Sequence, residues 1–455
     1  MLQLRLVAET VAAAVVAASL AVATAAAAEP TNTTWVVDRD RTQCANADFS
    51  SIQAAVDTAQ PGDLIKVCPD RYSESVVIDK PLRVKGDPGA IDTLDCFRPT
   101  LSELSTERQA IVDPAGDGFS TGLELAANGV VVEGLVVEGA SVGIDAGDAH
   151  SGYRMKHNLI QRNALFGIDF GSDGMHRSRV DHNCLRENNY GLVSELDDDS
   201  LWRNGDGPER DRWNARDLTN ARIDHNHTFR NQSGCCGGGL AASGPGQRDQ
   251  VIFDHNTQRE EPIGILLQNA TRSAILANHI AVSRFFAILI GGANDTLEIR
   301  ANTMRGGNTG LRFEPPQFID ILPTPTRNAL VSHNDVRGAV AGIYARPASL
   351  TESEISHNRT SDNGGNGINM FSSGNLIRQN EADNNVVAGI TAFPGATGNR
   401  FEHNSMHGNG SSAGASFPGA DARDLNPLVN GTLQNVWIGN DCDTDIPAGM
   451  ICGVG

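Results

Sequence analysis

The chain has 455 residues, of which 40% are hydrophobic and 5% aromatic, and it carries 48 glycines and a net charge of −19. This length allows one large domain or two to three ordinary ones, and the scarcity of aromatic residues favours a core of aliphatic side chains. A surface this acidic argues against nucleic acid and anionic membranes as partners, and it repels acidic polysaccharides unless Ca²⁺ or a local arginine patch intervenes.

The first 28 residues are predicted to be a signal peptide. Arg5 supplies a positive charge, an apolar run covers residues 11–23, and small residues lead to a cleavage site near Ala28. A retained membrane anchor is the alternative. No later stretch is long and apolar enough to span a bilayer. We therefore expect a secreted protein that has no membrane contact once the signal peptide is removed.

Export permits disulfides, and the cysteine count of eight is even. Cys44 and Cys68 bracket one predicted structural unit, and Cys442 and Cys452 bracket another, so we predict these two disulfides. The pairing of the other four remains open: Cys96, Cys184, Cys235 and Cys236. No Cys-x2-Cys spacing occurs, which disfavours a cysteine metal site.

Residues 29–95 are predicted to form an amino-terminal cap and the first turns of the fold. Phe49, Ile52, Val56 and Ala59 fall on one face of a short helix, for which Ser50 or Ser51 is the N-cap. Two strands follow the turn "QPGD". Such a helix would cover the open end of a coil, where exposed strand edges otherwise aggregate.

Residues 96–412 contain a repeat marked by asparagine, and residues 413–455 are predicted to close the fold. The steps between successive marker residues are mostly 22 to 25 residues, which is typical of a solenoid. Short alternating segments precede each marker, and Gly followed by an aliphatic residue comes after most of them, so each coil consists of short strands. We expect asparagine to adopt the left-handed backbone at the corners and its amides to form a ladder along the coil. The markers are Asn158, Asn183, Asn226, Asn256, Asn278, Asn302, Asn334, Asn358, Asn380 and Asn404.

A histidine precedes the marker in seven units. A catalytic histidine would occur once in a unique setting, whereas a histidine at the same phase of seven units indicates a structural stack. The seven are His157, His182, His225, His255, His333, His357 and His403.

The segment "FSSIQAAVDTAQPGDLIKVCPDRYSESVVIDKPLRVKGD" and the asparagine-rich units resemble the pectin lyase-like superfamily. Similar units occur in periplasmic copper-maturation proteins of the nitrous oxide reductase system, and "NVWIGNDCDTDIPAGMIC" resembles the closing segment of secreted actinobacterial β-helix proteins. The resemblance implies an all-β, right-handed parallel β-helix with a short amino-terminal capping helix. One such fold carries many chemistries.

The catalytic motifs of the superfamily are incomplete in this chain. No pectinesterase Gln-Asp motif is present, and "ARPASL" has half of the pectate lyase arginine element. The stretch "FGIDFGSDGMH" matches the start of the mannuronan C5-epimerase motif at Phe166 to Asp169 but lacks its Pro-His.

The residue after each Gly-aliphatic pair should point outward, because the aliphatic side chain points inward. In this column Asp145 and Asp169 are predicted to lie one coil apart, at about 4.8 Å. The same alignment brings Asp148 near Asp173 and His150 near His176. Two such carboxylates would share a proton as general acid and base, or bind Ca²⁺ through oxygen. The alternative is a solvated acidic turn.

These residues give the predicted site. The catalytic candidates are Asp145, Asp169, Asp173 and His176, and the metal candidates are Asp145, Asp148, Asp169 and Asp173. Candidates for substrate binding come from the insertion at residues 195–217 and from the outward column, because sugars stack on aromatic faces and arginine holds carboxylates. They are Trp202, Arg203, Arg212, Trp213, Arg312 and Tyr344. The alternative for the insertion is a charged surface loop packed down by its tryptophans.

Two functions follow from the sequence. The first is a secreted lyase, epimerase or hydrolase of extracellular polysaccharide, of which a uronate-containing glycan is the favoured substrate. The second is a non-catalytic β-helix that binds carbohydrate at a cell wall or surface. A metallochaperone role would need Met or Cys ligands that the repeat lacks. We expect a monomer that requires no cofactor, with Ca²⁺ as the one candidate ligand.

Overall fold

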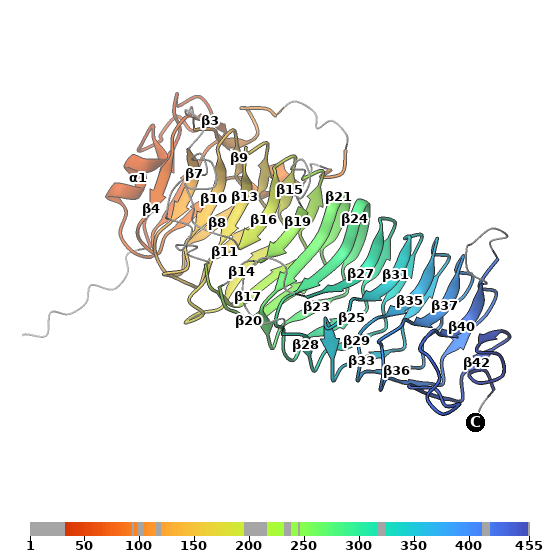
Figure 1. Cartoon of the computed structure of the whole chain (residues 1–455). Helices are drawn as coiled ribbons and strands as arrows, with labels where there is room; N and C mark the ends of the chain where they lie inside the picture. Colours follow the sequence, from red (N-terminus) through yellow and green to blue (C-terminus); the bar gives the residue numbers. More distant parts are fainter. Residues whose placement is uncertain are drawn as a thin grey trace, which may run out of the picture.

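The structure is a computed structural model that describes residues 32–92, 95–98, 104–114, 120–194, 216–231, 238–243, 246–315, 324–411 and 419–453. The predicted fold is confirmed: the chain is a right-handed parallel β-helix, and Figure 1 shows its coils stacked along one axis from α1 to β42. The predicted signal peptide, the insertion residues Trp202, Arg203, Arg212 and Trp213, and Cys235 and Cys236 lie outside the described residues. In the described part of the chain, no helix is long and apolar enough to cross a membrane.

Each coil contributes strands to three faces. The first face holds the strands that precede the marker asparagines, and these pair in parallel from the first coil to the last. They are β1 (Thr34–Val37), β2 (Leu64–Val67), β5 (Arg83–Lys85), β8 (Val131–Glu133), β11 (Arg154–Lys156), β14 (Ser178–Asp181), β17 (Leu218–Asp224), β20 (Arg248–Asp254), β23 (Ala274–Leu276), β25 (Glu298–Arg300), β29 (Leu330–Ser332), β33 (Glu354–Ser356), β36 (Leu376–Arg378), β38 (Arg400–Glu402) and β41 (Val436–Ile438), with β22 (Ala270–Thr271) beside β20.

The second face follows the marker asparagines. It consists of β3 (Asp70–Tyr72), β6 (Ala110–Val112), β9 (Val136–Glu138), β12 (Leu159–Gln161), β15 (Cys184–Arg186), β18 (His227–Phe229), the starts of β21 (Thr257–Gln268) and β24 (His279–Gly291), β26 (Thr303–Arg305), β30 (Asp335–Arg337) and β34 (Arg359–Ser361).

The third face completes each coil. It consists of β4 (Val76–Ile78), β7 (Thr121–Leu125), β10 (Val142–Ala146), β13 (Phe166–Phe170), β16 (Tyr190–Ser194), β19 (Gly238–Ala242), the ends of β21 and β24, β27 (Thr309–Glu314), β31 (Ala341–Ala345), β35 (Asn366–Met370), β37 (Ala388–Ala392), β40 (Ala420–Asp424) and β43 (Asp445–Ile446). Two short pairs lie beside these faces, β28 (Thr326–Arg327) with β32 (Leu350–Thr351) and β39 (Ser405–Met406) with β42 (Asp441–Cys442).

Stacked aliphatic side chains form the core. Ile144 lies opposite Ile168, and Ile168 opposite Leu192, so equivalent residues of successive coils meet inside the solenoid. All three are fully buried. Strands of three to five residues suffice because burial comes from stacking along the axis rather than from long sheets.

The marker asparagines form the predicted ladder. The side-chain Oδ1 of Asn302 accepts bonds from both the backbone N and the Nδ2 of Asn278, each at 2.9 Å, and the Nδ2 of Asn302 donates to Asn334 Oδ1 at 2.9 Å. The pattern repeats from Asn158 to Asn440. It satisfies buried backbone groups at a corner where no strand pairing is available.

The expectation that asparagine takes the left-handed backbone is wrong. That conformation belongs to the residue before it, with φ of 53° at His157 and 57° at His182. Histidine is one of the few residues enriched at positive φ, which gives it a physical reason to occupy this corner. Its rings also stack, with centroids 5.0 Å apart between His182 and His225 and 4.9 Å apart between His333 and His357, so the predicted histidine stack is confirmed.

Helix α1 (Ile52–Thr58) caps the first coil as predicted (Figure 1). Ser51 is the N-cap, and its hydroxyl accepts a bond from Ala54 N. Glu74 adds a carboxylate that accepts bonds from the N–H groups of Ile52 at 2.8 Å and Gln53 at 3.1 Å, where the helix dipole favours negative charge. Ile52 and Val56 are fully buried against the end of the core.

The disulfides Cys44–Cys68 and Cys442–Cys452 are formed as predicted. The structure adds Cys96–Cys184, which the sequence left open. This third bond fastens the segment after the short helix α2 (Pro88–Asp92) to the outside of the second face, where Leu159 and Phe229 pack against it.

Candidate functional site

The outward column on the third face is in the predicted register. Asp145 lies opposite Asp169 on the next coil, and Glu124, which sequence reasoning missed, lies opposite Asp145 on the coil before. Further along the same column Arg312 lies opposite Tyr344. The sequence therefore placed four of these side chains, Asp145, Asp169, Arg312 and Tyr344, in one column of the third face. The two aspartates lie several coils from the Arg–Tyr pair.

Arg216 lies between the two aspartates. Its Nη1 is 2.5 Å from Asp145 Oδ1 and 3.5 Å from Asp169 Oδ2. The side chains of Arg216 and Asp169 are 9% and 6% exposed, whereas that of Asp145 is 26% exposed. A guanidinium in this position compensates both negative charges, so the pair does not need a shared proton to coexist at one coil spacing.

Asp148 and Asp173 bond to backbone amides nearby. Asp148 accepts a bond from Asp217 N at 3.1 Å, which holds the end of the 195–217 insertion against the coil. Asp173 accepts a bond from Met175 N at 2.9 Å. A hydrogen bond from Ser151 and the nearby imidazoles of His150 and His176 hold the pKa of Asp173 below its ordinary value. Both histidines therefore lie close to Asp173.

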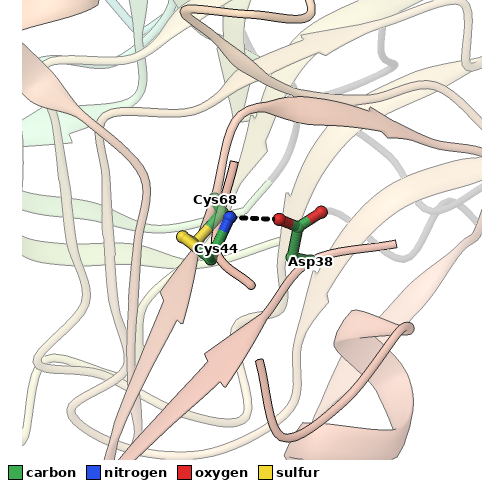
Figure 2. A group of neighbouring side chains, drawn as sticks. All are labelled: Asp38, Cys44 and Cys68. Atoms are coloured by element: carbon green, nitrogen blue, oxygen red, sulfur yellow. Dashed lines mark hydrogen bonds between the residues drawn. A yellow bond between two sulfur atoms is a disulfide. The ribbon is translucent and has the colours of Figure 1, made fainter. Parts of the chain in front are cut away.

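Two groups of potential metal-binding side chains converge in the described part of the chain, and both contain Asp38. In the first, ligand atoms of Asp38, Cys44 and Cys68 lie within 4.8 Å of one another. Figure 2 shows that this group is a structural cross-link: the two sulfurs are bonded to each other, and Asp38 accepts a hydrogen bond from Cys44 N at 2.5 Å. The second combines Asp38 with Asp40 and Asp70, and Asp70 is paired with Arg39 at 3.3 Å. Neither group contains the four predicted Ca²⁺ ligands, for which metal binding stays a prediction.

Arg312 and Tyr344 belong to an aromatic stack on the third face. The Arg312 guanidinium lies 5.1 Å from the Tyr344 ring centroid. Tyr344 stacks on Phe371 at 5.2 Å, and Phe371 on Phe393 at 3.8 Å with the planes 10° apart. Both faces of the Phe371 ring are covered, so its edge is the part available to a ligand.

A groove of about 440 Å³ crosses the loops that follow β27, β31, β35 and β37. Prolines from three of these four loops form its walls, together with Phe371 and two hydroxyl side chains. Its lining is Pro325, Arg327, Pro347, Ala348, Leu350, Thr351, Phe371, Ser373, Pro394 and Gly395. The groove therefore has apolar walls and a few polar groups, the usual composition of a small-molecule or sugar site.

Comparisons with known proteins agree with this architecture. Residues 219–417 match the family described as periplasmic copper-binding protein (NosD). This chain is a right-handed parallel β-helix protein. A search of curated proteins found no match to it.

Solved structures similar to this β-helix protein share its fold. The Dettilon tailspike protein is 14% identical over 84% of this chain, with a TM-score of 0.46, and the chain spans 64% of that protein's length. The A-module of the Azotobacter vinelandii mannuronan C-5 epimerase AlgE6 is 11% identical over 87% of this chain and 94% of its own, with a TM-score of 0.45. A mannuronic acid specific polysaccharide family 6 lyase from human gut microbiota is 11% identical over 87% and 91%, with a TM-score of 0.42.

Sequence reasoning missed Arg216, Phe371 and Arg327. Arg216 had a signal, because two outward carboxylates on adjacent coils call for a nearby cation and the insertion ends in an arginine. Phe371 directly follows β35 and Arg327 lies in the short strand β28, and neither position belongs to the outward column that the sequence singled out.

Proposed function

We propose that this β-helix protein is exported and binds extracellular polysaccharide in the groove across the loops after β27, β31, β35 and β37. The observation that carries the proposal is the lining of that groove: Pro347 and Pro394 two coils apart, the Phe371 edge on the loop between them, and the hydroxyls of Thr351 and Ser373. Sugars bury their C–H faces against such apolar surfaces, while hydroxyl side chains fix their orientation. The three disulfides of the described residues suit an oxidising compartment.

A panel of polysaccharides and their oligosaccharides, measured by calorimetry with and without Ca²⁺, tests this proposal. The double variant Pro347→Ala/Pro394→Ala removes two exposed rings without removing a hydrogen-bond donor, and we expect about tenfold weaker glycan binding. Pro427→Ala, at an exposed proline that does not line the groove, is the matched control. Glycan affinity that is unchanged in the double variant would place the binding surface elsewhere.

A specific observation keeps a catalytic function as the second candidate. Asp145, Asp169 and Arg216 bring two carboxylates and a guanidinium together on the third face, where Asp145 is 26% exposed, and lyases, epimerases and hydrolases of polysaccharides use groups of these kinds. Under this proposal, Asp145→Asn abolishes the formation of unsaturated uronate or of reducing ends. Asp148→Asn, one loop away, leaves product formation unchanged. Turnover retained by Asp145→Asn would reject this site as catalytic.

A further inference from the structure

The groove presents few side-chain acceptors of hydrogen bonds. None of the described residues that line it is Asp, Glu, Asn or Gln, although the chain has 55 Asp and Glu residues. Its polar side chains are those of Arg327, Thr351 and Ser373, and the other lining residues are apolar. A sugar hydroxyl donates one hydrogen bond as well as accepting them, so a ligand with many free hydroxyls needs acceptors that this lining does not offer.

Two carboxylates near the groove are engaged within the protein. Asp295 is joined to Arg327 by a backbone bridge, and its Oδ1 accepts a bond from Asn328 Nδ2 at 2.7 Å. Glu314 pairs with Arg346 just after β31, with its Oε2 at 3.1 Å from Nη1. Both carboxylates therefore already have a donor inside the protein.

The two hydroxyls in the groove differ in their engagement. Ser373 Oγ donates to Gly395 O at 3.2 Å and accepts a bond from Thr397 N at 3.0 Å. The half-buried Thr351 hydroxyl makes no hydrogen bond to another described residue, and its strand β32 places it opposite Arg327 on β28. The groove thus offers a ligand the donors of Thr351 and Arg327.

The rest of the lining suits apolar groups and partial negative charge. Pro347 and Pro394 are exposed, and Leu350 contributes to the lining although it is only 1% exposed. Both faces of the Phe371 ring are covered, and the edge of an aromatic ring carries the partial positive charge that attracts a carbonyl oxygen. A substituent with a methyl group and a carbonyl oxygen matches this surface, and an acetyl ester has both.

We propose that the groove selects glycans whose hydroxyls carry O-acetyl groups, with the methyl group against Pro347 and Pro394 and the carbonyl oxygen accepting a hydrogen bond from Thr351. This inference rests on the proposed function, which requires only that the groove binds a glycan. It adds the chemical modification that is recognised and the residue that discriminates it. Acetylation also removes hydroxyl donors that would lose their hydrogen bonds to water without replacement.

The experiment uses acetylated oligosaccharides of xylan and of glucomannan, each compared with the same oligosaccharide after alkaline deacetylation. We expect the wild-type protein to bind the acetylated form about tenfold more tightly in calorimetry, and added salt to leave this preference unchanged because both forms are neutral. Thr351→Val keeps the shape of the side chain and removes its donor. It should lose about fivefold in affinity for the acetylated form and little for the deacetylated one.

A second variant supplies the acceptor that the lining lacks. Ala348 lines the groove, is exposed and has a φ of 55°, a conformation that Asp adopts more readily than Ala, so Ala348→Asp should fold normally. Its carboxylate can accept hydrogen bonds from free sugar hydroxyls, and we expect the preference for the acetylated form to fall to about threefold. Thr303→Val is the matched control for Thr351→Val, because Thr303 is a half-buried threonine on β26 that does not line the groove, and it should change neither affinity.

The outcomes separate this inference from the proposed function. Equal or tighter binding of the deacetylated forms, or a Thr351→Val variant that keeps the full preference, would overturn the inference and leave glycan binding intact. So would binding of an unacetylated glycan from the panel by a protein that binds neither acetylated oligosaccharide. A protein that binds no glycan, acetylated or not, would instead overturn the proposed function.

Discussion

Glu261 occupies a buried position that asparagine fills in the preceding coils. Asn163, Asn188 and Asn231 form a second ladder, and Glu261 continues it by accepting bonds from Asn231 N at 3.0 Å and Asn231 Nδ2 at 2.9 Å. Burial raises the pKa of Glu261 to about 8, despite the opposing hydrogen bonds from Asn231 and Thr228. The Glu261 carboxyl group thus takes the place of an asparagine amide in this ladder, because its neutral form can accept the same hydrogen bonds.

The presence of a glutamate at position 261 predicts that the stability of the protein depends on pH. A carboxyl whose pKa is raised on folding binds more protons in the folded state, so its contribution is fully present below about pH 4.5 and is lost as pH rises through about 8. We expect Glu261→Gln to flatten the fall in the free energy of unfolding between pH 5 and 8, measured by urea denaturation. Glu260→Gln, at the adjacent exposed residue, should retain the wild-type slope.

Arg216 makes the second prediction at the residue scale. Arg216→Met would leave Asp145 and Asp169 facing each other without their shared cation, so we expect a loss of about 3 kcal/mol in the free energy of unfolding. Thermal unfolding of the variant at pH 7 measures it. A variant as stable as the wild-type protein would show that the two carboxylates are solvated well enough to need no cation.

The segment around Cys96 is held in place by a disulfide and by hydrogen bonds, in addition to the stacking of the coils. The segment that contains Cys96 runs across the outside of the second face, and the disulfide to Cys184 joins it to β15. Arg186, which is fully buried, adds bonds from its Nη1 to the carbonyls of Cys96 at 3.3 Å and Arg98 at 3.0 Å. The disulfide and these hydrogen bonds therefore hold the Cys96 segment against the central coils.

The Cys96–Cys184 and Cys442–Cys452 disulfides should differ in how much each stabilises the folded protein. Cys96–Cys184 closes a separation of 88 residues and Cys442–Cys452 one of 10, so loop-closure entropy predicts a loss of about 4 kcal/mol for Cys96→Ala/Cys184→Ala and about 3 kcal/mol for Cys442→Ala/Cys452→Ala. Calorimetry of both double variants checks the ranking. The reverse order would mean that Arg186 and the surrounding packing hold the segment without the covalent bond.

The molecule as a whole behaves as a one-dimensional stack, in which the marker asparagines couple each coil to the next. Asn302 lies near the middle of this ladder, so Asn302→Ala would leave both donors of Asn278 without their acceptor in a buried corner. We expect a loss of about 3 kcal/mol in the free energy of unfolding. Unfolding should also occur in two steps, because the ladder no longer couples the coils on the two sides of Asn302. Asn440→Ala, at the last ladder position, should keep a single step. Circular dichroism during urea denaturation separates the two outcomes.

The sequence predicted the positions of residues within the repeat and missed those of residues outside it. The period placed Asp145 and Asp169 on one face, and the recurring His-Asn pairs located the corners, because a solenoid converts fixed spacing into vertical neighbours. Arg216 comes near the end of an insertion whose path no period determines, so its position could be found only in the folded chain. The same limit explains why Cys96 had no assigned partner, since its segment lies outside the repeat.

The most direct test of this account is a crystal structure of the protein with a bound oligosaccharide from the glycan panel. We predict a sugar ring between Pro347 and Pro394, against the edge of the Phe371 ring. An oligosaccharide bound along Asp145 and Asp169, with the groove left vacant, would contradict the account and transfer the function to the acidic column.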